Sequence, residues 1–200
     1  MPNIEKLTEN LKKHGFDVSY YETGAEAVKA LTEKIQGKTV GIGGSKTVET
    51  LGLFEALTPG NQVSWHWKKT SPDANDVSAR AQVYLCSANG VAETGEIINI
   101  DGTGNRIAAA EYGREAVYII IGVNKIAPDY ESALWRARNI AAPLNAKRLD
   151  RKTPCALSAE MKCYDCDSPE RICRGLSVFY RKLTGVKTCE VVIINEELGY

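Results

Sequence analysis

Apolar residues recur at helical spacing in the first part of the chain and then give way to short strand-like runs. Ile4, Leu7 and Leu11 predict a first helix. Residues 16–22 predict a short strand, and Thr23–Glu26 form a capping box that begins a second helix. The chain therefore opens with a helix–strand–helix pattern.

The same alternation continues to the end of the chain. Residues 117–122 form an apolar run rich in β-branched side chains, which is typical of a strand buried on both faces of a parallel sheet. A helical apolar stripe begins at Asp129 and reaches Leu144. Further strands are predicted at residues 39–42, 62–67, 82–86, 96–100 and 189–195, and short helices after residue 47 and near residues 72–80. The pattern predicts an α/β fold with a layered sheet.

Composition narrows the class of protein. The chain has 200 residues, of which 44% are hydrophobic and 25% charged, so it suits one ordinary globular domain. Lys plus Arg and Asp plus Glu both number 25, and this balance argues against a nucleic-acid or membrane-surface protein. No apolar run approaches the about 20 residues of a membrane span. The polar start, Met1–Lys13, does not resemble a signal peptide, so we expect a cytoplasmic protein.

A glycine-rich loop, Gly41–Thr47, joins a predicted strand to a predicted helix. Glycines let the backbone approach a ligand closely, and the free N–H groups at a helix start favour an anion. The spacing before Lys46 does not match the phosphate-binding loop of nucleotide hydrolases. The alternative is a tight turn in which Ser45 only caps the helix. The predicted anion ligands here are Gly43, Gly44, Ser45 and Thr47.

A second polar cluster spans residues 87–106 and suggests a surface cleft. Glu93 is a candidate general base or nucleophile if its surroundings tune its pKa. Lys125 follows the most apolar strand and is expected in the same cleft. The alternative is that these are turn residues, with Glu93 in solvent and Lys125 on the surface. The other candidate ligand residues are Asn89, Thr94, Asn99, Asp101 and Asn105.

Four of the six cysteines fall close together. Cys155, Cys163, Cys166 and Cys173 supply four thiols, and a Cys-x-x-Cys pair can reach one metal from a single turn. Such a set suits zinc or an iron–sulfur cluster, and the spacing does not decide between them. A redox role for Cys163 and Cys166, or four unliganded thiols, are the alternatives.

Several stretches together resemble the LUD (lactate utilisation) domain family. They are 41–52, Ala92–Gly95 with 99–106 behind it, 117–125 followed by Pro128, the cysteine-bearing tail from Thr153 to Cys173, and the ending 194–200. The tail resembles a short, cysteine-bearing branch of that family. The resemblance implies a three-layer α/β/α fold with a mostly parallel sheet, of the NagB/RpiA/CoA-transferase type. The chain has no repeats and no low-complexity linker, so we also expect a single domain over residues 1–200, with a cysteine-rich insertion at about 151–174.

The resemblance carries expectations about activity. In the broader group, a glycine-rich loop binds sugar phosphates or CoA esters, which implies that Gly43, Gly44, Ser45 and Thr47 hold the anion. Glu93 stands where that group often has an acidic catalytic residue. The LUD family itself is linked to lactate oxidation within a multi-subunit iron–sulfur system.

Three functions are therefore expected. The first is an accessory protein or subunit in lactate-type organic-acid utilisation that works with iron–sulfur oxidoreductase subunits. It would bind an organic acid, a sugar phosphate or a CoA ester at Gly41–Thr47. The second is an isomerase or an acyl/CoA-transfer enzyme that uses Glu93. The third is a non-catalytic small-molecule sensor. Trp65 and Trp67, if exposed, would suit a homodimer.

Overall fold

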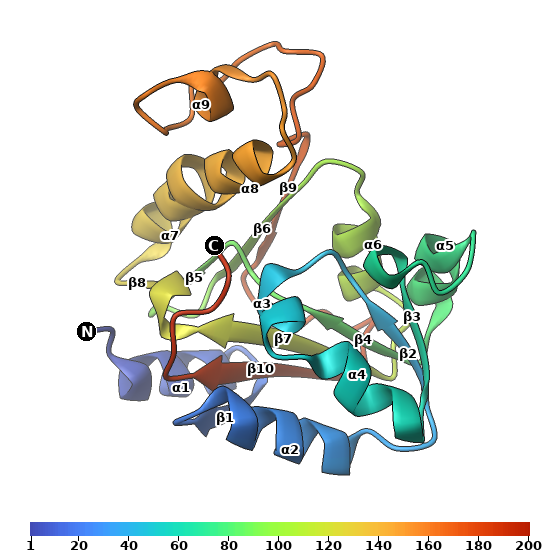
Figure 1. The fold of residues 1–200 in the computed structure, drawn as a ribbon. Helices are drawn as coiled ribbons and strands as arrows, with labels where there is room; N and C mark the ends of the chain where they lie inside the picture. The colour runs from blue at the N-terminus through green and yellow to red at the C-terminus, as the bar shows by residue number, and fades with distance from the viewer.

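A six-stranded parallel sheet forms the centre of the molecule in the computed structural model, which describes residues 1–200 (Figure 1). The strand order is β1-β10-β7-β4-β2-β3. The apolar runs predicted as buried strands form β7 and β10 near the middle of the sheet, where they pair with each other. The strands are β1 Asp17–Tyr21, β2 Thr39–Ile42, β3 Gln62–Trp65, β4 Val83–Cys86, β7 Ala116–Gly122 and β10 Thr188–Ile194.

Helices α2, α3 and α4 cover one face of this sheet. Thr23 and Glu26 form the predicted capping box at the start of α2, so this element is confirmed. Leu31 of α2 and Leu53 of α4 are buried in one cluster with Trp65 and Ile120 of the sheet. The bounds are α2 Gly24–Lys34, α3 Lys46–Thr50 and α4 Leu53–Leu57, followed by the short helix η1 Thr58–Gly60.

The other face is covered by three helices and a second sheet. Leu7 and Leu11 of α1 and Ala109 of α6 pack in a cluster with Ile119 of the sheet. Helix α5 crosses so close to β2 that a Cβ on Gly41 would lie 2.4 Å from the Ser78 carbonyl oxygen. The bounds are α1 Ile4–Lys13, α5 Ala74–Arg80 and α6 Asn105–Glu111, with η2 His66–Lys68 after β3.

The second sheet has four strands in the order β8-β5-β6-β9. Strand β6 pairs antiparallel with both β5 and β9, and β5 pairs parallel with β8. Val91 and Ile97 on one face pack toward the central sheet, and Ala92 and Ile98 on the other pack toward the next helix. The strands are β5 Gly90–Ala92, β6 Ile97–Asp101, β8 Ile126–Ala127, preceded by η3 Val123–Lys125, and β9 Gly175–Phe179.

One long helical segment lies over the second sheet. It consists of α7 Tyr130–Arg136, the π-helical turn η4 Ala137–Ala141 and α8 Ala142–Arg148. The helix predicted to start at Asp129 is confirmed, and the Asp129 side chain caps it by accepting the Ser132 N–H at 2.8 Å. Small side chains such as Ala133 allow close packing, since a Cβ on Gly90 would lie 2.4 Å from the Ala133 carbonyl oxygen.

The fold class predicted from the sequence is confirmed: helices flank a parallel sheet in a three-layer α/β/α arrangement. One expectation is corrected. The alternative interpretation of residues 87–106 as turns fails, because they contain β5, the start of α6 and β6, which confirms the strand predicted at 96–100 and is buried throughout. The predicted strand 62–67 also ends earlier, at Trp65. None of the helices is long and apolar enough to cross a membrane.

The cysteine-rich segment follows the long helix and precedes β9. It contains one short helix, α9 Pro154–Leu157, and otherwise has no regular structure up to Gly175. Figure 1 shows that this segment stands at the far end of α8, beyond the second sheet. It therefore overhangs the ends of the central strands, where the predicted site residues gather.

Candidate functional site

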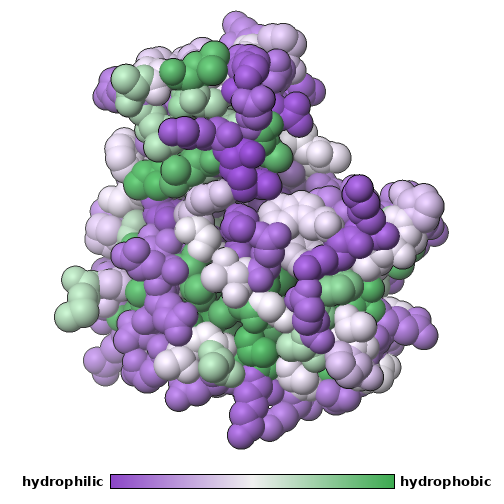
Figure 2. All heavy atoms as spheres, in the orientation of Figure 1, coloured by the Kyte–Doolittle hydropathy of each residue, from purple (hydrophilic) through white to green (hydrophobic).

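A cleft of about 630 Å³ opens at the carboxyl ends of the central strands. The glycine-rich loop and the residues after β3 and β4 line one side, and α8 with the cysteine-rich segment lines the other. Figure 2 shows that hydrophilic residues gather where the α8–α9 region overhangs α3. Open α/β sheets bind ligands at this edge, so the cleft is the candidate functional site.

The lining of the cleft is strongly basic. Seven of its residues are lysine or arginine, and only Asp101 and Glu170 are acidic. This excess contrasts with the zero net charge of the whole chain, so positive charge is concentrated here. Such a concentration attracts anions. The basic residues are Lys46, Arg106, Lys125, Arg148, Arg151, Arg171 and Arg174.

The glycine-rich loop contributes part of what the sequence predicted. Gly44 and Ser45 line the cleft. The Ser45 hydroxyl accepts the Val48 N–H at 3.2 Å, so it also caps α3. Gly43 instead lies against Tyr84, whose hydroxyl would be 2.5 Å from an added Cβ. Thr47 is fully buried, and neither it nor Gly43 lines the cleft.

The final residues of the chain hold the glycine-rich loop in place through hydrogen bonds. The Thr47 hydroxyl donates to the Leu198 carbonyl oxygen at 3.2 Å, and the Leu198 N–H donates to Asn124 Oδ1 at 3.1 Å. Arg136 donates to the Tyr200 carbonyl oxygen at 3.3 Å, and Tyr200 itself lines the cleft. Residues 195–200 therefore form a C-terminal strap that joins the glycine-rich loop to the segment after β7.

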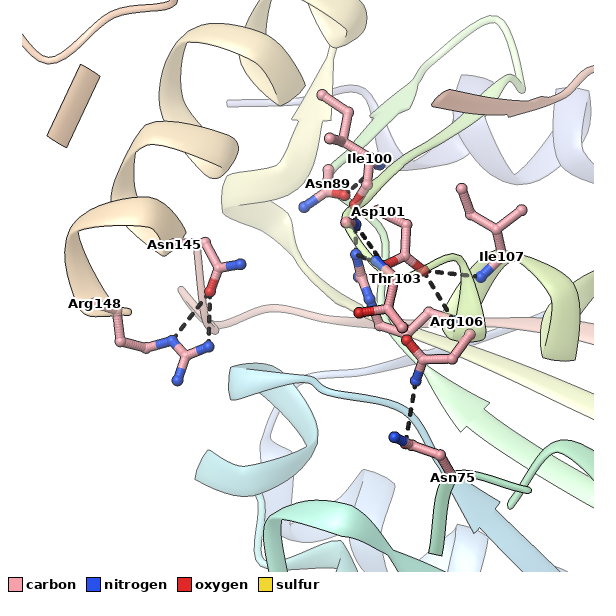
Figure 3. Close-up of polar contacts among 11 residues, drawn as sticks. Asn75, Asn89, Ile100, Asp101, Thr103, Arg106, Ile107, Asn145 and Arg148 are labelled. Carbon is pink, nitrogen blue, oxygen red and sulfur yellow. Dashed lines mark hydrogen bonds and ion pairs between the residues drawn. The ribbon is translucent and has the colours of Figure 1, made fainter. Parts of the chain in front are cut away.

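Asp101 organises the lip of the cleft rather than offering a free carboxylate. Its Oδ1 accepts the Gly102 N–H at 2.8 Å and the Thr103 N–H at 3.3 Å. Its Oδ2 accepts the N–H groups of Arg106 and Ile107 at the start of α6 (Figure 3). Because these backbone donors occupy both oxygens, Asp101 serves to fix the turn that presents Arg106.

Two predicted asparagines also line the cleft. Asn89 Oδ1 accepts the Ile100 N–H at 2.7 Å, which leaves the side-chain NH₂ group without a protein partner. The Asn105 side chain donates to Asn75 Oδ1 at 3.3 Å. Asn89 is therefore oriented by the second sheet with its donor group available to a ligand, while Asn105 joins α6 to α5.

Arg148 and Asn145 of α8 face the Asp101 turn across the cleft (Figure 3). Arg148 donates to Asn145 Oδ1 through Nε at 3.0 Å and Nη2 at 2.8 Å. Its guanidinium carbon also lies 4.8 Å from the ring centroid of Trp67. A neutral amide and an aromatic face hold this cation in place without neutralising it. Its charge therefore remains available to an anion.

Lys125 is the most buried cation in the cleft, with only 4% of its surface exposed. Its Nζ donates to Ser87 Oγ at 3.0 Å and to the Ala88 carbonyl oxygen at 3.1 Å. No carboxylate pairs with it. Burial, and then the positive charges of Arg136 and Arg106, lower the pKa of Lys125 to about 7. A substantial fraction of this side chain is therefore a neutral amine near neutral pH.

Glu93 lies outside the cleft. Its Oε1 accepts the Asn3 N–H at 2.8 Å, and its Oε2 lies 3.2 Å from Lys6 Nζ. Asn10 also donates to the Glu93 carbonyl oxygen at 2.8 Å. The residue thus anchors the N-terminal end of α1 to the end of β5. This position gives Glu93 a structural role and gives no support to the predicted catalytic one.

Two further predicted ligand residues are not part of the cleft. The Thr94 hydroxyl donates to Glu96. Asn99 is buried in β6, and its Oδ1 has no hydrogen-bond partner. The structure therefore brings together Gly44, Ser45, Asn89, Asp101, Asn105 and Lys125, and it leaves out Gly43, Thr47, Glu93, Thr94 and Asn99.

Several cleft residues were not among the sequence candidates. Arg148 and Arg151 belong to a basic run, 147–152, at the end of the long helix. This run could have indicated the site from the sequence, because it contains more cations than the end of a helix requires. Nothing in the sequence marked Ser87 or Trp67 as site residues, since a lone serine or tryptophan after a strand is common.

The four clustered cysteines all line a second, smaller cavity behind the cleft wall. All six cysteines of the chain are free thiols. No group of three or more His, Cys, Asp or Glu side chains is close enough together to hold a metal ion as the side chains stand. The zinc or iron–sulfur prediction therefore stays a prediction at this point.

Comparisons with known proteins agree with this architecture. The model of a family described as the LUD domain matches residues 4–194. The chain is also similar to a crystal structure of a DUF162 family protein from Deinococcus radiodurans, with a TM-score of 0.57 and 12% identity. That similarity covers 96% of this chain and 95% of the other, and at such identity it concerns the fold alone. No curated protein matches the chain.

Proposed function

Because the chain belongs to the LUD-domain family, we propose that it is an accessory protein or subunit in lactate-type organic-acid utilisation, with the basic cleft as its ligand site. Family membership supports a relation to lactate utilisation in general. The observation that carries the ligand site is the set of seven basic residues around one cleft. We place the protein in the cytoplasm, where reducing conditions keep thiols free.

The ligand class follows from charge and size. A cleft of about 630 Å³ has the volume of sites that enclose cofactor-sized ligands, and lactate alone would leave most of it to water. Lactate also has a single negative charge. Of the anions expected from the sequence, a sugar phosphate or a CoA ester therefore fits better than a free organic acid.

Individual residues have distinct roles in this proposal. Arg148 and Arg151 contact the phosphate directly, because the protein offers neither guanidinium a carboxylate partner. Arg106 sets the positive potential of the opposite lip, and the Asn89 NH₂ group donates to a polar oxygen of the ligand. Asp101 is a positioning residue, since it fixes the turn that carries Arg106.

Calorimetric titration of the full chain tests the proposal. Lactate, pyruvate, a sugar phosphate and a CoA ester are each titrated at low and at high salt. We expect the phosphorylated compounds to bind more tightly, and we expect salt to weaken their binding because exposed charges are screened. If none of the four binds, or if lactate binds most tightly at both salt concentrations, the assignment of the cleft to a phosphorylated anion is wrong.

Lys125 supports a second candidate function, an enzyme that acts on carbonyl compounds. A buried lysine with a pKa of about 7 supplies a neutral amine, which is the form that attacks carbonyl carbon. The nitrogen would bond to the carbonyl carbon, the carbonyl oxygen would leave as water, and an imine would remain. In this candidate Lys125 takes the reactive role that the sequence suggested for Glu93.

Trapping with borohydride tests this second candidate. Borohydride reduces an imine to a stable secondary amine, so incubation with pyruvate should leave a mass increment on the peptide that contains Lys125. The Lys125→Met variant should show none. Modification of exposed lysines alone, with Lys125 unmodified, would remove imine chemistry from consideration and leave the binding function unaffected.

A further inference from the structure

We propose that the thiols of Cys155, Cys163, Cys166 and Cys173 form a four-thiolate metal centre. All four line one small cavity at the far end of α8, although they come from a short helix and from an irregular loop. Zinc and an iron–sulfur cluster share this ligand chemistry. The centre lies directly behind one wall of the cleft, so it also holds that wall in place.

Cys163 and Cys166 lie in an irregular part of the loop, and both line the same cavity. Asp165 between them has a left-handed conformation, with φ at 45°. The Asp165 N–H lies 3.4 Å from Cys163 Sγ, so it donates to that sulfur. The loop therefore supplies a hydrogen-bond donor to one of the two sulfurs.

Arg171 connects this part of the loop to Cys173 through hydrogen bonds. It donates through Nη1 to the Cys166 carbonyl oxygen at 2.8 Å and through Nε to the Cys173 carbonyl oxygen at 2.9 Å. Its third group, Nη2, lies 3.1 Å from Asp165 Oδ1. One guanidinium thus connects three points of the loop. Because this loop has no regular secondary structure, these hydrogen bonds keep the cysteines around one cavity.

The surroundings of the cavity suit an anionic centre. Four thiolates carry more negative charge than a divalent metal or a cluster core neutralises, so the bound centre is negative overall. Arg138 of η4 reaches over it and donates to Cys163 Sγ at 3.7 Å. Pro143 and Ala146 of α8 provide an apolar floor. Cations and apolar walls of this kind stabilise a buried negative centre and limit its contact with water.

The cavity itself is small. Its volume is about 20 Å³, roughly the room that one water-sized sphere requires. Since no three of the cysteines yet approach a common point, their side chains must rotate inward to enclose a single ion. A cluster would in addition require the loop to move outward. The shared requirement is that all four cysteines line the same space, and the structure meets it.

The centre and the cleft have a common wall. Arg171 and Ile172 line both cavities. Gly102 of the cleft lip packs so closely on this wall that an added Cβ would lie 2.7 Å from the Ile172 carbonyl oxygen. The Arg174 N–H donates to the Asp101 carbonyl oxygen at 2.9 Å. Metal binding therefore orders the segment that supplies Arg171 and Arg174 to the cleft.

Metal and sulfide analysis of the full chain, purified without oxygen, tests the proposal. We expect either about one zinc per chain and no colour, or iron with matching sulfide and visible absorption from the cluster. Both results support the four-thiolate centre, and they distinguish its two forms. A Cys163→Ser/Cys166→Ser double variant should lose about tenfold or more of the bound metal.

Two single variants serve as controls for the metal analysis. Cys86→Ala and Cys189→Ala change the two cysteines outside the cluster, and they should retain the metal. Circular dichroism establishes whether the double variant still folds. A parent chain that carries no metal, or that joins these cysteines in disulfides, overturns the proposal. So does a folded double variant with undiminished metal. None of these results depends on which anion binds in the cleft.

Discussion

Lys125 Nζ lies 3.0 Å from Ser87 Oγ, and the two side chains follow neighbouring strands, β7 and β4, of the central sheet. The Ala88 carbonyl oxygen takes the second hydrogen bond. A neutral amine has two N–H donors, so these two acceptors satisfy it completely and leave its lone pair free. The protein therefore provides a site that matches an uncharged lysine better than a charged one.

The pKa of Lys125 makes a prediction about stability. It is about 7 in the folded chain against an ordinary value of 10.5, so between these limits the unfolded chain binds one proton more. The folded chain therefore becomes more stable as the pH rises from about 7 to 10.5. The free energy of unfolding of the parent, minus that of Lys125→Met, should increase with pH by up to about 1.4 kcal/mol per unit.

Urea unfolding of both chains, at matched values from about pH 6 to about pH 10, measures this difference. Exposed Lys147 offers a control, because Lys147→Met should give a difference from the parent that hardly varies with pH. A constant difference for Lys125→Met as well would mean that Lys125 remains charged in the folded chain.

Arg148 is the cleft residue whose loss should affect anion binding most directly. Arg148→Gln removes a cation that only an amide and an aromatic face hold in place. A hydrogen bond to a charged group contributes roughly 1.5–3 kcal/mol, so we expect about a 10- to 150-fold loss of affinity for the phosphorylated ligand. Titration calorimetry measures it. Lys147→Gln on the same helix lies outside the cleft and should bind normally.

Glu93→Gln should reduce stability and leave ligand binding intact. The substitution removes the charge that accepts the Asn3 N–H and pairs with Lys6, and a charged hydrogen bond of this kind contributes about 1–3 kcal/mol. Thermal unfolding should show the loss, while titrations at the cleft should match the parent. Lys6→Ala should cost less, because Lys6 is largely exposed. Loss of ligand binding or turnover in a folded Glu93→Gln chain would restore Glu93 to the site.

Two glycines test the contact between the cleft lip and the cysteine-rich segment. In Gly102→Ala the new Cβ would lie 2.7 Å from the Ile172 carbonyl oxygen, so the backbone must shift, at a cost of about 1–3 kcal/mol. Gly175→Ala introduces only ordinary contacts, the nearest at 3.6 Å. We expect Gly102→Ala alone to weaken anion binding and to raise hydrogen exchange over residues 169–174. Equal behaviour of the two variants would show that the wall is not coupled to the lip.

The central sheet was predictable because its strands are marked locally. Residues 117–122 and 191–194 are apolar without interruption, and the capping box at Thr23 marks α2 directly. Strands β5, β8 and β9 were missed. Three and two residues are too few to show a period in β5 and β8, and β9 directly follows the irregular cysteine-rich segment. Their hydrogen bonds depend on partners elsewhere in the chain. Strand β6, in contrast, was predicted at residues 96–100 and is confirmed.

The candidate site was also predictable only in part. Lys125 and the glycine-rich loop were found because each follows a strand, and parallel strands end at one edge of their sheet. Arg148 comes from the far end of a helix, and Glu93 binds a residue ninety positions away. Spacing along the sequence contains no information on either contact. Long-range packing places Arg148 in the cleft and Glu93 outside it.

The C-terminal strap has a practical consequence for assays. Tyr200 lines the cleft, and the backbone just before it holds Thr47 and Asn124. An affinity tag fused after Tyr200 would emerge at the mouth of the cleft, where its charges would compete with added anions. A tag before Met1 would leave from the end of α1 near Glu93 (Figure 1). Protein for binding studies is therefore better tagged at the N-terminus.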